Sequence, residues 1–286
     1  LIQMDDIELI GVSAIGADSY IEPAVSASQK IINRFSDQPI HVAASKERGK
    51  HPFPKDWRMH AFFMDALPIL NEPSNQHSLL LKQPAYQDII VKLQAPSQKV
   101  TLLFTGPLTD LAKAITVEPT IVQNIDCLVW MGGTFLDKGN VEEPEHDGTA
   151  EWNAFWDPDA VKRVLDSDLK IQMVGLESTE ELPLTDELRQ HWASLRKYPA
   201  IDLVGLGYSL IISVPNAELY LWDVLTTMSA LYPELVETRQ VKANIITSGL
   251  ASGRMFIDPN GKEITEVTKA DKDLFFKKVD KILERQ

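Results

Sequence analysis

The sequence predicts an α/β fold with one mainly parallel central sheet flanked by helices. Short apolar runs typical of buried strands alternate along the chain with segments of helical spacing. Strands separated by helices favour parallel pairing, with the helices covering both faces of the sheet. Because no internal repeat or long linker interrupts this pattern, residues 1–286 are expected to form one domain.

The first half of the chain supplies four of the expected strands. The run IELIGVS at 7–13 is continuously apolar, as in a strand covered on both faces, and VTLLF and CLVWM have the same character. Gly106 and Pro107 begin a helix directly after VTLLF. The expected strands are 7–13, 40–44, 100–104 and 127–131, and the expected helices are 23–35, 86–93 and 106–115.

The second half of the chain is expected to be mostly helical. Asp157 is a suitable N-cap for a helix at 158–165, because its side chain can accept from the first free backbone N–H groups. A strand is expected at 171–176, mostly helical structure from 183 to 232, a β-hairpin at 242–246 and 254–257, and a charged amphipathic helix at 272–285.

Composition excludes several classes of protein. The net charge is −13, with 28 Lys and Arg against 41 Asp and Glu, which argues against nucleic acid or an anionic membrane as partner. A single cysteine, Cys127, excludes an internal disulfide and a cysteine-based zinc site. No apolar run approaches the roughly 20 residues that span a bilayer. These features favour a cytoplasmic protein that binds a small molecule or a metal cation.

Polar residues follow the expected strands, where ligands bind in sheets of this kind. Asp18 follows the first strand, Thr105 follows VTLLF, and Met131 precedes a Gly-Gly pair. G-x-G-x-x-G, the P-loop pattern and G-x-S-x-G are all absent. Dinucleotide binding, phosphoryl transfer and serine hydrolysis therefore lose their usual sequence support.

Several segments together resemble the inosine-uridine-type nucleoside hydrolase family. The similar segments are TGPLTDLA, VWMGG and DGTAEWNAFWDPDA, in the family's order and spacing, over most of the chain. FPKDWR and the Trp in YLWD resemble the purine-specific (inosine-adenosine-guanosine) branch, since Trp222 stands where the pyrimidine-tolerant branch has a His. The resemblance implies a nucleoside hydrolase-like fold with a Rossmann-like core, one bound Ca²⁺ and a homodimer.

The resemblance also implies roles for individual residues. Thr105 and Asp223 would be calcium ligands, Asp18, Trp222 and Asp223 would be catalytic, and Trp57 and Trp222 would hold the purine base between them. The expected substrate-binding residues are Trp57, Met131, Asn140, Glu151, Trp152, Asn153 and Trp222. The substrate would be a purine nucleoside such as inosine, adenosine or guanosine, cleaved at its N-ribosidic bond through oxocarbenium character on the sugar.

One family feature is absent from the printed sequence. The Asp cluster D-x-D-x-x-x-D-D, which supplies most calcium ligands and the general base, would precede Leu1. We therefore expect the first strand of the family's sheet to lie upstream of this sequence, and the chain as given to be a poor hydrolase. A non-catalytic nucleoside- or ribose-binding protein of the same fold is the alternative.

Structural explanations compete with the functional ones. A Trp is commonly a core residue, and this is the simplest reading of Trp130, Trp156 and Trp192. Asp110 is expected to be structural, and no functional role is assigned to any His. Residues 177–179 are expected to cap a helix that starts near Pro183.

Overall fold

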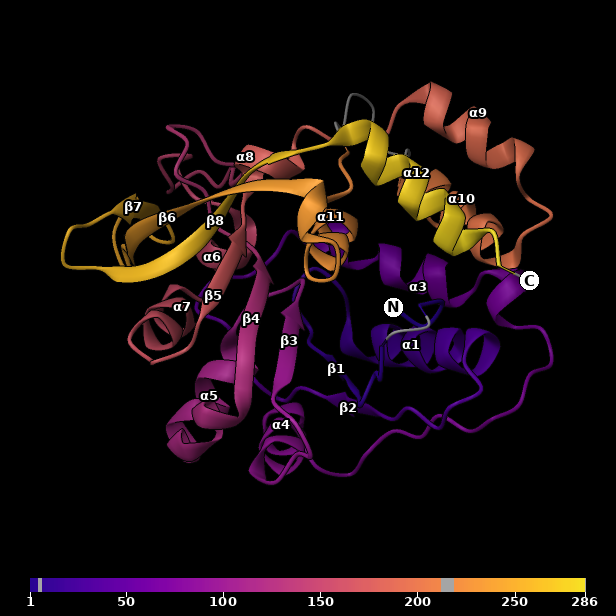
Figure 1. Cartoon of the computed structure of the whole chain (residues 1–286), viewed down its shortest axis with the longest axis horizontal. Coiled ribbons are helices and arrows are strands. Elements are labelled where there is room, and N and C mark those ends of the chain that lie inside the picture. The colour runs from indigo at the N-terminus through magenta and orange to yellow at the C-terminus, as the bar shows by residue number, and fades with distance from the viewer. Residues whose placement is uncertain (5–6, 212–218, 286) are drawn as a thin grey trace.

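The computed structural model describes residues 1–4, 7–211 and 219–285, and contains two sheets (Figure 1). A small parallel sheet pairs β1 with β2, and a six-stranded sheet has the order β3-β4-β5-β8-β6-β7. Within the larger sheet β3, β4, β5 and β8 run parallel, while β6 is antiparallel to both β8 and β7. The expected α/β class is confirmed, and the central sheet is mixed.

The strands of the small sheet are short, whereas β6 and β8 form a long twisted arm (Figure 1). The strands are β1 (Val12–Ala14), β2 (Val42–Ala44), β3 (Val100–Phe104), β4 (Ile125–Met131), β5 (Ile171–Val174), β6 (Val236–Ile245), β7 (Met255–Ile257) and β8 (Lys262–Ala270).

Helices connect the strands and cover both faces of the larger sheet (Figure 1). The longer helices are α1 (Ile21–Phe35), α4 (Ala85–Gln94), α5 (Thr109–Val117), α7 (Pro158–Leu165), α9 (Asp186–Ser194), α10 (Pro199–Ile211), α11 (Trp222–Ser229) and α12 (Lys272–Leu283). The shorter ones are α2 (Lys55–Arg58), α3 (His60–Asp65), α6 (Trp152–Trp156), α8 (Leu176–Thr179) and the 3₁₀ turns η1 (Pro68–Leu70), η2 (Pro119–Asn124) and η3 (Pro233–Leu235).

The core of the larger sheet has two halves because side chains of a strand alternate between its faces. Leu128 and Trp130 of β4 pack into the half covered by α4, α5 and α7. Val129 points to the other face and packs with Leu225 of α11 and Phe275 of α12. Burial on both faces explains why β4 reads as a continuous apolar run.

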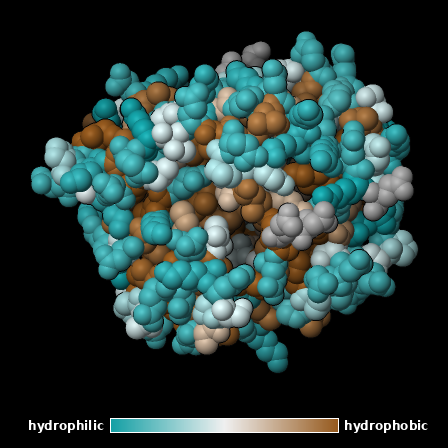
Figure 2. All heavy atoms as spheres, viewed as in Figure 1, coloured by the Kyte–Doolittle hydropathy of each residue, from teal (hydrophilic) through white to brown (hydrophobic). Residues whose placement is uncertain are grey.

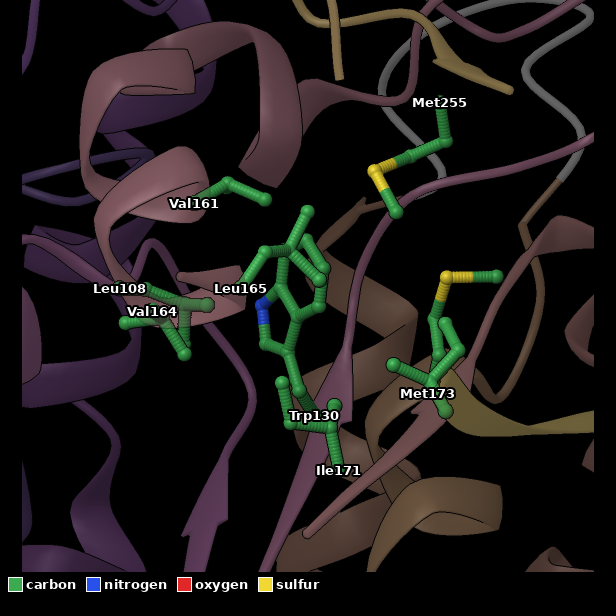
Figure 3. A pocket seen from close by; sticks show the side chains of 9 residues that line it. Leu108, Trp130, Val161, Val164, Leu165, Ile171, Met173 and Met255 are labelled. Carbon is green, nitrogen blue, oxygen red and sulfur yellow. The ribbon is translucent and has the colours of Figure 1, made fainter. Parts of the chain in front are cut away.

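Trp130 is a core residue, as expected, and is 1% exposed. Figure 3 shows its indole among the aliphatic side chains of α7, with Met173 and Met255 on the other side. Its Nε1 donates to the carbonyl of Gly106 at 3.1 Å, so the indole joins the loop after β3 to the end of β4. A Cβ on Gly132 would lie 2.2 Å from the indole, so the chain needs glycine there.

Several sequence predictions need correction. The first strand is β1 at Val12–Ala14 rather than 7–13, and Ile10 is 40% exposed, so this run is not covered on both faces. The strand β8 was not predicted, because charged residues interrupt its apolar pattern. One of them, Glu266, is fully buried and accepts bonds at 2.7 and 3.1 Å from Arg239 on β6. This paired charge is compatible with a buried strand.

The remaining expected elements are present, with some shifted bounds. The strand β6 begins at Val236 rather than at 242, and β5 ends at Val174 rather than at 176, where α8 already begins. Asp157 caps α7 by accepting from Ala160 N at 3.1 Å. The mostly helical stretch contains α9, α10 and α11, and its residues 212–218 lie outside the described part of the chain.

Two further features concern the helices and one face of the molecule. Among the described residues, no helix combines the length and apolar character that a membrane span requires. Figure 2 shows a largely hydrophilic face whose centre is hollowed, with hydrophobic residues gathered around the hollow.

Candidate active site

Several of the predicted site residues lie near the carboxyl ends of the strands. Asp18 follows β1 and Thr105 directly follows β3, while Asp223 lies in the first turn of α11. The carboxylates of Asp18 and Glu151 both raise the pKa of Asp223 electrostatically. Residues more than 200 positions apart in the chain therefore share one acidic site.

Asp223 holds a proton more readily than an ordinary aspartate. Burial raises its pKa to about 7, with further upward contributions from Asp18 and Glu151, and a hydrogen bond from the side chain of Thr105 partly opposes the shift. The residue nevertheless keeps solvent-exposed surface. Asp223 is therefore surrounded by protein atoms on several sides, while part of its surface remains accessible to solvent.

Asp18, which interacts electrostatically with Asp223, has a similar environment. Its pKa is raised chiefly by desolvation, although it also keeps exposed surface. The hydroxyl of Ser19 donates to Asp18 Oδ1 at 3.4 Å, and electrostatic interactions with Arg58 and His60 favour the ionised form of Asp18. Sequence reasoning gave Arg58 and His60 no role, because a charge acting through space leaves no local sequence signal.

Glu151 is 2% exposed and caps the short helix α6. Its Oε1 accepts from Asn153 N at 2.9 Å, and its Oε2 accepts from Ala154 N at 3.1 Å and Gly133 N at 2.8 Å. Burial raises its pKa to about 7 even though these backbone donors oppose the shift. A carboxylate has about four acceptor positions, so three such bonds leave room for one ligand hydroxyl.

Asn153 is oriented by the end of β4. Its Nδ2 donates to the carbonyl of Met131 at 3.1 Å and lies 3.4 Å from the Met131 sulfur. Met131 itself is 3% exposed. The Oδ1 of Asn153 is therefore the atom that remains to accept a bond from a ligand.

Asn140 lies next to the same helix terminus. Its Oδ1 accepts from Trp152 N at 3.1 Å, while its backbone N–H donates to the carbonyl of Ala150 at 3.0 Å. The Asn140 carboxamide therefore offers its two N–H donors to a ligand. Asn140, Glu151 and Asn153 thus present one free donor group and two acceptors around a single helix start.

Trp57 and Trp152 belong to one aromatic cluster with Phe53. Trp152 is 5% exposed, stacks on Phe53 at 5.1 Å, and meets Trp57 edge to face at 5.1 Å. Trp57 is 40% exposed, so it has a free ring surface that Trp152 does not have. The cluster fixes the loop before α2 against α6.

Trp222 begins α11 directly beside Asp223. Its ring is half-buried and lies 5.6 Å from the ring of Tyr220, and within the described part of the chain its buried indole Nε1 has no hydrogen-bond partner. Tyr208 of α10 interacts electrostatically with Asp223. Burial raises the pKa of the Tyr208 phenol, and the charge of Asp223 adds to this rise. Sequence reasoning did not single out Tyr208.

The described donors fit a calcium site only in part. Thr105 and Asp223 are neighbours and offer the oxygen ligands that calcium prefers, but calcium takes six to eight of them. Within the described ranges, no cluster of three or more His, Cys, Asp or Glu side chains is suited to hold a metal ion. We therefore derive no reaction step through a metal.

Three sequence interpretations of structural roles can also be judged. Trp156 and Trp192 are buried in the core, 4% and 2% exposed, as expected. Asp110 is 3% exposed, and its Oδ1 accepts from Tyr86 N at 3.1 Å, in keeping with the expected structural role.

The interpretation of residues 177–179 as a cap was wrong. The helix after Pro183 is α9, whose N-cap is Thr185, while Glu177 lies within α8 and binds the loop after β4. The contact spans more than 40 residues, so the local pattern could not reveal it.

The fold is α/β, and the carboxylates of Asp18, Glu151 and Asp223 interact electrostatically near the carboxyl ends of its strands. The chain belongs to the inosine-uridine preferring nucleoside hydrolase family, whose model matches residues 1–277. This confirms the family that the sequence resemblance indicated.

Individual relatives support the same assignment. A crystal structure of the inosine-uridine preferring nucleoside hydrolase of Bacillus anthracis is 48% identical, with a TM-score of 0.95, over 99% of this chain and 92% of that one. The inosine-uridine preferring nucleoside hydrolase of Leishmania major is 24% identical over 98% of this chain and 90% of its own length. The match to a probable uridine nucleosidase 2 of Arabidopsis thaliana, 28% identical, spans 59% of this chain and about half (52%) of that relative.

Proposed function

We propose that the protein hydrolyses the N-ribosidic bond of purine nucleosides to give the free base and ribose. The observation that carries the proposal is the electrostatic coupling of Asp18, Glu151 and Asp223, with the oriented amides of Asn140 and Asn153 at the helix start that Glu151 caps. A sugar with several hydroxyls suits such a mixture of donors and acceptors. Membership of the family supports the reaction class.

In the proposed reaction, the bond from the anomeric carbon to the base nitrogen breaks while a water oxygen bonds to that carbon. The developing oxocarbenium charge is stabilised by the surrounding carboxylates. The water gives up one proton to a carboxylate and keeps the other on the new ribose hydroxyl. The departing base takes one proton from solvent onto a ring nitrogen, and the carboxylate then releases its proton to solvent. We assign Asp18 and Asp223 to the reacting water, and Asn140, Glu151, Asn153 and Met131 to the ribose.

We assign the base to Trp57 and Trp222, with Trp152 supporting Trp57 from behind. A stacked aromatic pair contributes roughly 0.5–1.5 kcal/mol beyond burial, and a purine offers a larger face than a pyrimidine. Cation–π attraction also favours a protonated purine. If calcium binds, Thr105 and Asp223 are its proposed ligands, and it would lower the pKa of the attacking water.

The test is a panel of inosine, guanosine, adenosine, uridine and cytidine, with released base and ribose measured by chromatography. Purine nucleosides should be cleaved with the higher kcat/KM. Binding of nucleoside without release of base would favour the alternative, a non-catalytic nucleoside- or ribose-binding protein. A homodimer, expected from the family resemblance, is tested separately by sedimentation of the same preparation.

A further inference from the structure

The loop that follows β4 is held by a glutamate from another element. Glu177 of α8 accepts through Oε1 from the hydroxyl of Thr134 at 3.0 Å and from the backbone N–H of Phe135. One residue earlier in the same loop, the N–H of Gly133 donates to Glu151 Oε2 at 2.8 Å. Two carboxylates from different elements thus bind consecutive residues of one loop.

The loop has a conformation that leaves little freedom. Gly133 has φ of 75°, in the left-handed region, and an added Cβ would lie 3.1 Å from the sulfur of Met173. Thr134 is 1% exposed. The anchored residues Thr134 and Phe135 follow Gly133 directly, so a shift in their position would also affect the direction of its N–H.

Burial of the Glu177 carboxylate is energetically unfavourable for one of its two oxygens. Its Oε2 is buried and has no hydrogen-bond partner among the described residues, and an added Cβ on Gly175 would lie only 2.4 Å from that oxygen. Burial raises the pKa of Glu177, with Glu266 adding to the shift. A buried polar atom without a partner is unfavourable, so its presence suggests a role for the side chain beyond stability.

We propose that Glu177 is a positioning residue for Glu151: by anchoring Thr134 and Phe135, it aims the Gly133 N–H at Glu151 Oε2 and so fixes the carboxylate for sugar binding. The last step rests on the proposed function, in which Glu151 binds the ribose. Glu177 itself is assigned no contact with substrate, so its loss should weaken binding more than it slows the chemical step.

The test compares Glu177→Ala with Glu177→Gln, which keeps a side-chain oxygen in the place of Oε1. The measurements are amide hydrogen exchange at Gly133 by NMR, and KM and kcat for inosine. Glu177→Ala should speed exchange at Gly133 by tenfold or more and raise KM by tenfold or more, with kcat reduced less than about threefold. Glu177→Gln should restore both quantities to within about threefold of the unmutated protein.

A matched control is Glu181→Ala, since Glu181 Oε2 accepts from Ala270 N at 3.0 Å and has no bond to this loop. It should leave Gly133 exchange and KM unchanged. If Glu177→Ala does not fold, Thr134→Val removes one donor to Glu177 and should raise KM in the same direction. A lowered melting temperature in either variant with unchanged Gly133 exchange and KM would overturn the proposal.

Failure of the proposed function gives a different result. If the unmutated protein cleaves no nucleoside, the assignment as a hydrolase fails, while faster Gly133 exchange in Glu177→Ala still supports the positioning of Glu151. If the unmutated protein is active and Glu177→Ala keeps both KM and slow exchange, the positioning role fails and the hydrolase assignment stands.

Discussion

Asn140 Oδ1 accepts from the backbone N–H of Trp152 at 3.1 Å, across twelve residues of loop. This bond fixes which way the carboxamide faces, and it leaves the two N–H donors of Asn140 for a ligand. The orientation of a side chain that the sequence could also assign to a turn is thereby fixed.

Replacing Asn140 with Asp should separate the bond to the Trp152 N–H from the donation of N–H groups to a ligand. The variant keeps an oxygen for Trp152 N but loses the N–H donors, so kcat/KM for inosine should fall by tenfold or more with little change in melting temperature. Asn140→Ala, which also loses the bond to Trp152, should in addition lower the free energy of unfolding by about 1 kcal/mol. Unchanged turnover in Asn140→Asp would remove Asn140 from the ribose site.

Trp222→Ala tests the assignment of the base. Loss of the ring should lower kcat/KM for inosine by at least tenfold, about 1.4 kcal/mol of transition-state free energy. Because the ring is only half-buried, the melting temperature should change little. Trp222→Phe, which keeps an aromatic face, is the control and should lose less activity. Equal rates on uridine and inosine in the unmutated protein would contradict base selection by the tryptophans.

Glu151 should make stability depend on pH. Its pKa rises from 4.5 to about 7 on folding, so the folded state binds the proton more tightly than the unfolded state. The resulting stabilisation is present below pH 4.5 and is lost as the pH rises through about 7. At about 1.4 kcal/mol per pKa unit, this amounts to roughly 3 kcal/mol.

This contribution is measured by urea unfolding of the unmutated protein and of Glu151→Gln. The measurements are made at several values between about pH 5 and pH 8, roughly the titration range. The unmutated protein should lose more stability toward high pH than the variant does. Other carboxylates with raised pKa, such as Asp223, leave some pH dependence in both proteins. Parallel curves would mean that Glu151 does not titrate in this range.

Asp223→Asn tests cation binding. A ligand that binds only the folded state stabilises it, so calcium should raise the melting temperature of the unmutated protein if Asp223 contributes to a site. This calcium-dependent rise in melting temperature should be absent in Asp223→Asn. Asp166→Asn, at an exposed aspartate paired with Lys162, is the control and should keep the calcium effect. An equal calcium effect in all three proteins would place the binding elsewhere.

The sequence by itself determined the α/β class, most helices and strands, and the family. These features depend on local patterns: apolar runs covered on both faces, N-caps such as Asp157, and short motifs of fixed order. It also placed Asp18, Thr105 and Met131 at strand ends, because the carboxyl ends of parallel strands meet at one edge. The strand β8 escaped prediction because the partner of its buried Glu266, Arg239, lies on another strand.

Only the tertiary structure decided how these residues act on one another. The pKa of Asp223 depends on Asp18 and Glu151, which are distant in sequence, and on burial that no single segment produces. The structure also decided that Trp57 keeps an exposed ring while Trp152 is buried behind it. Hydrogen bonds and electrostatic coupling act between residues that are distant in the sequence. Local sequence patterns can therefore identify candidate site residues, but they cannot give their orientation, burial or charge.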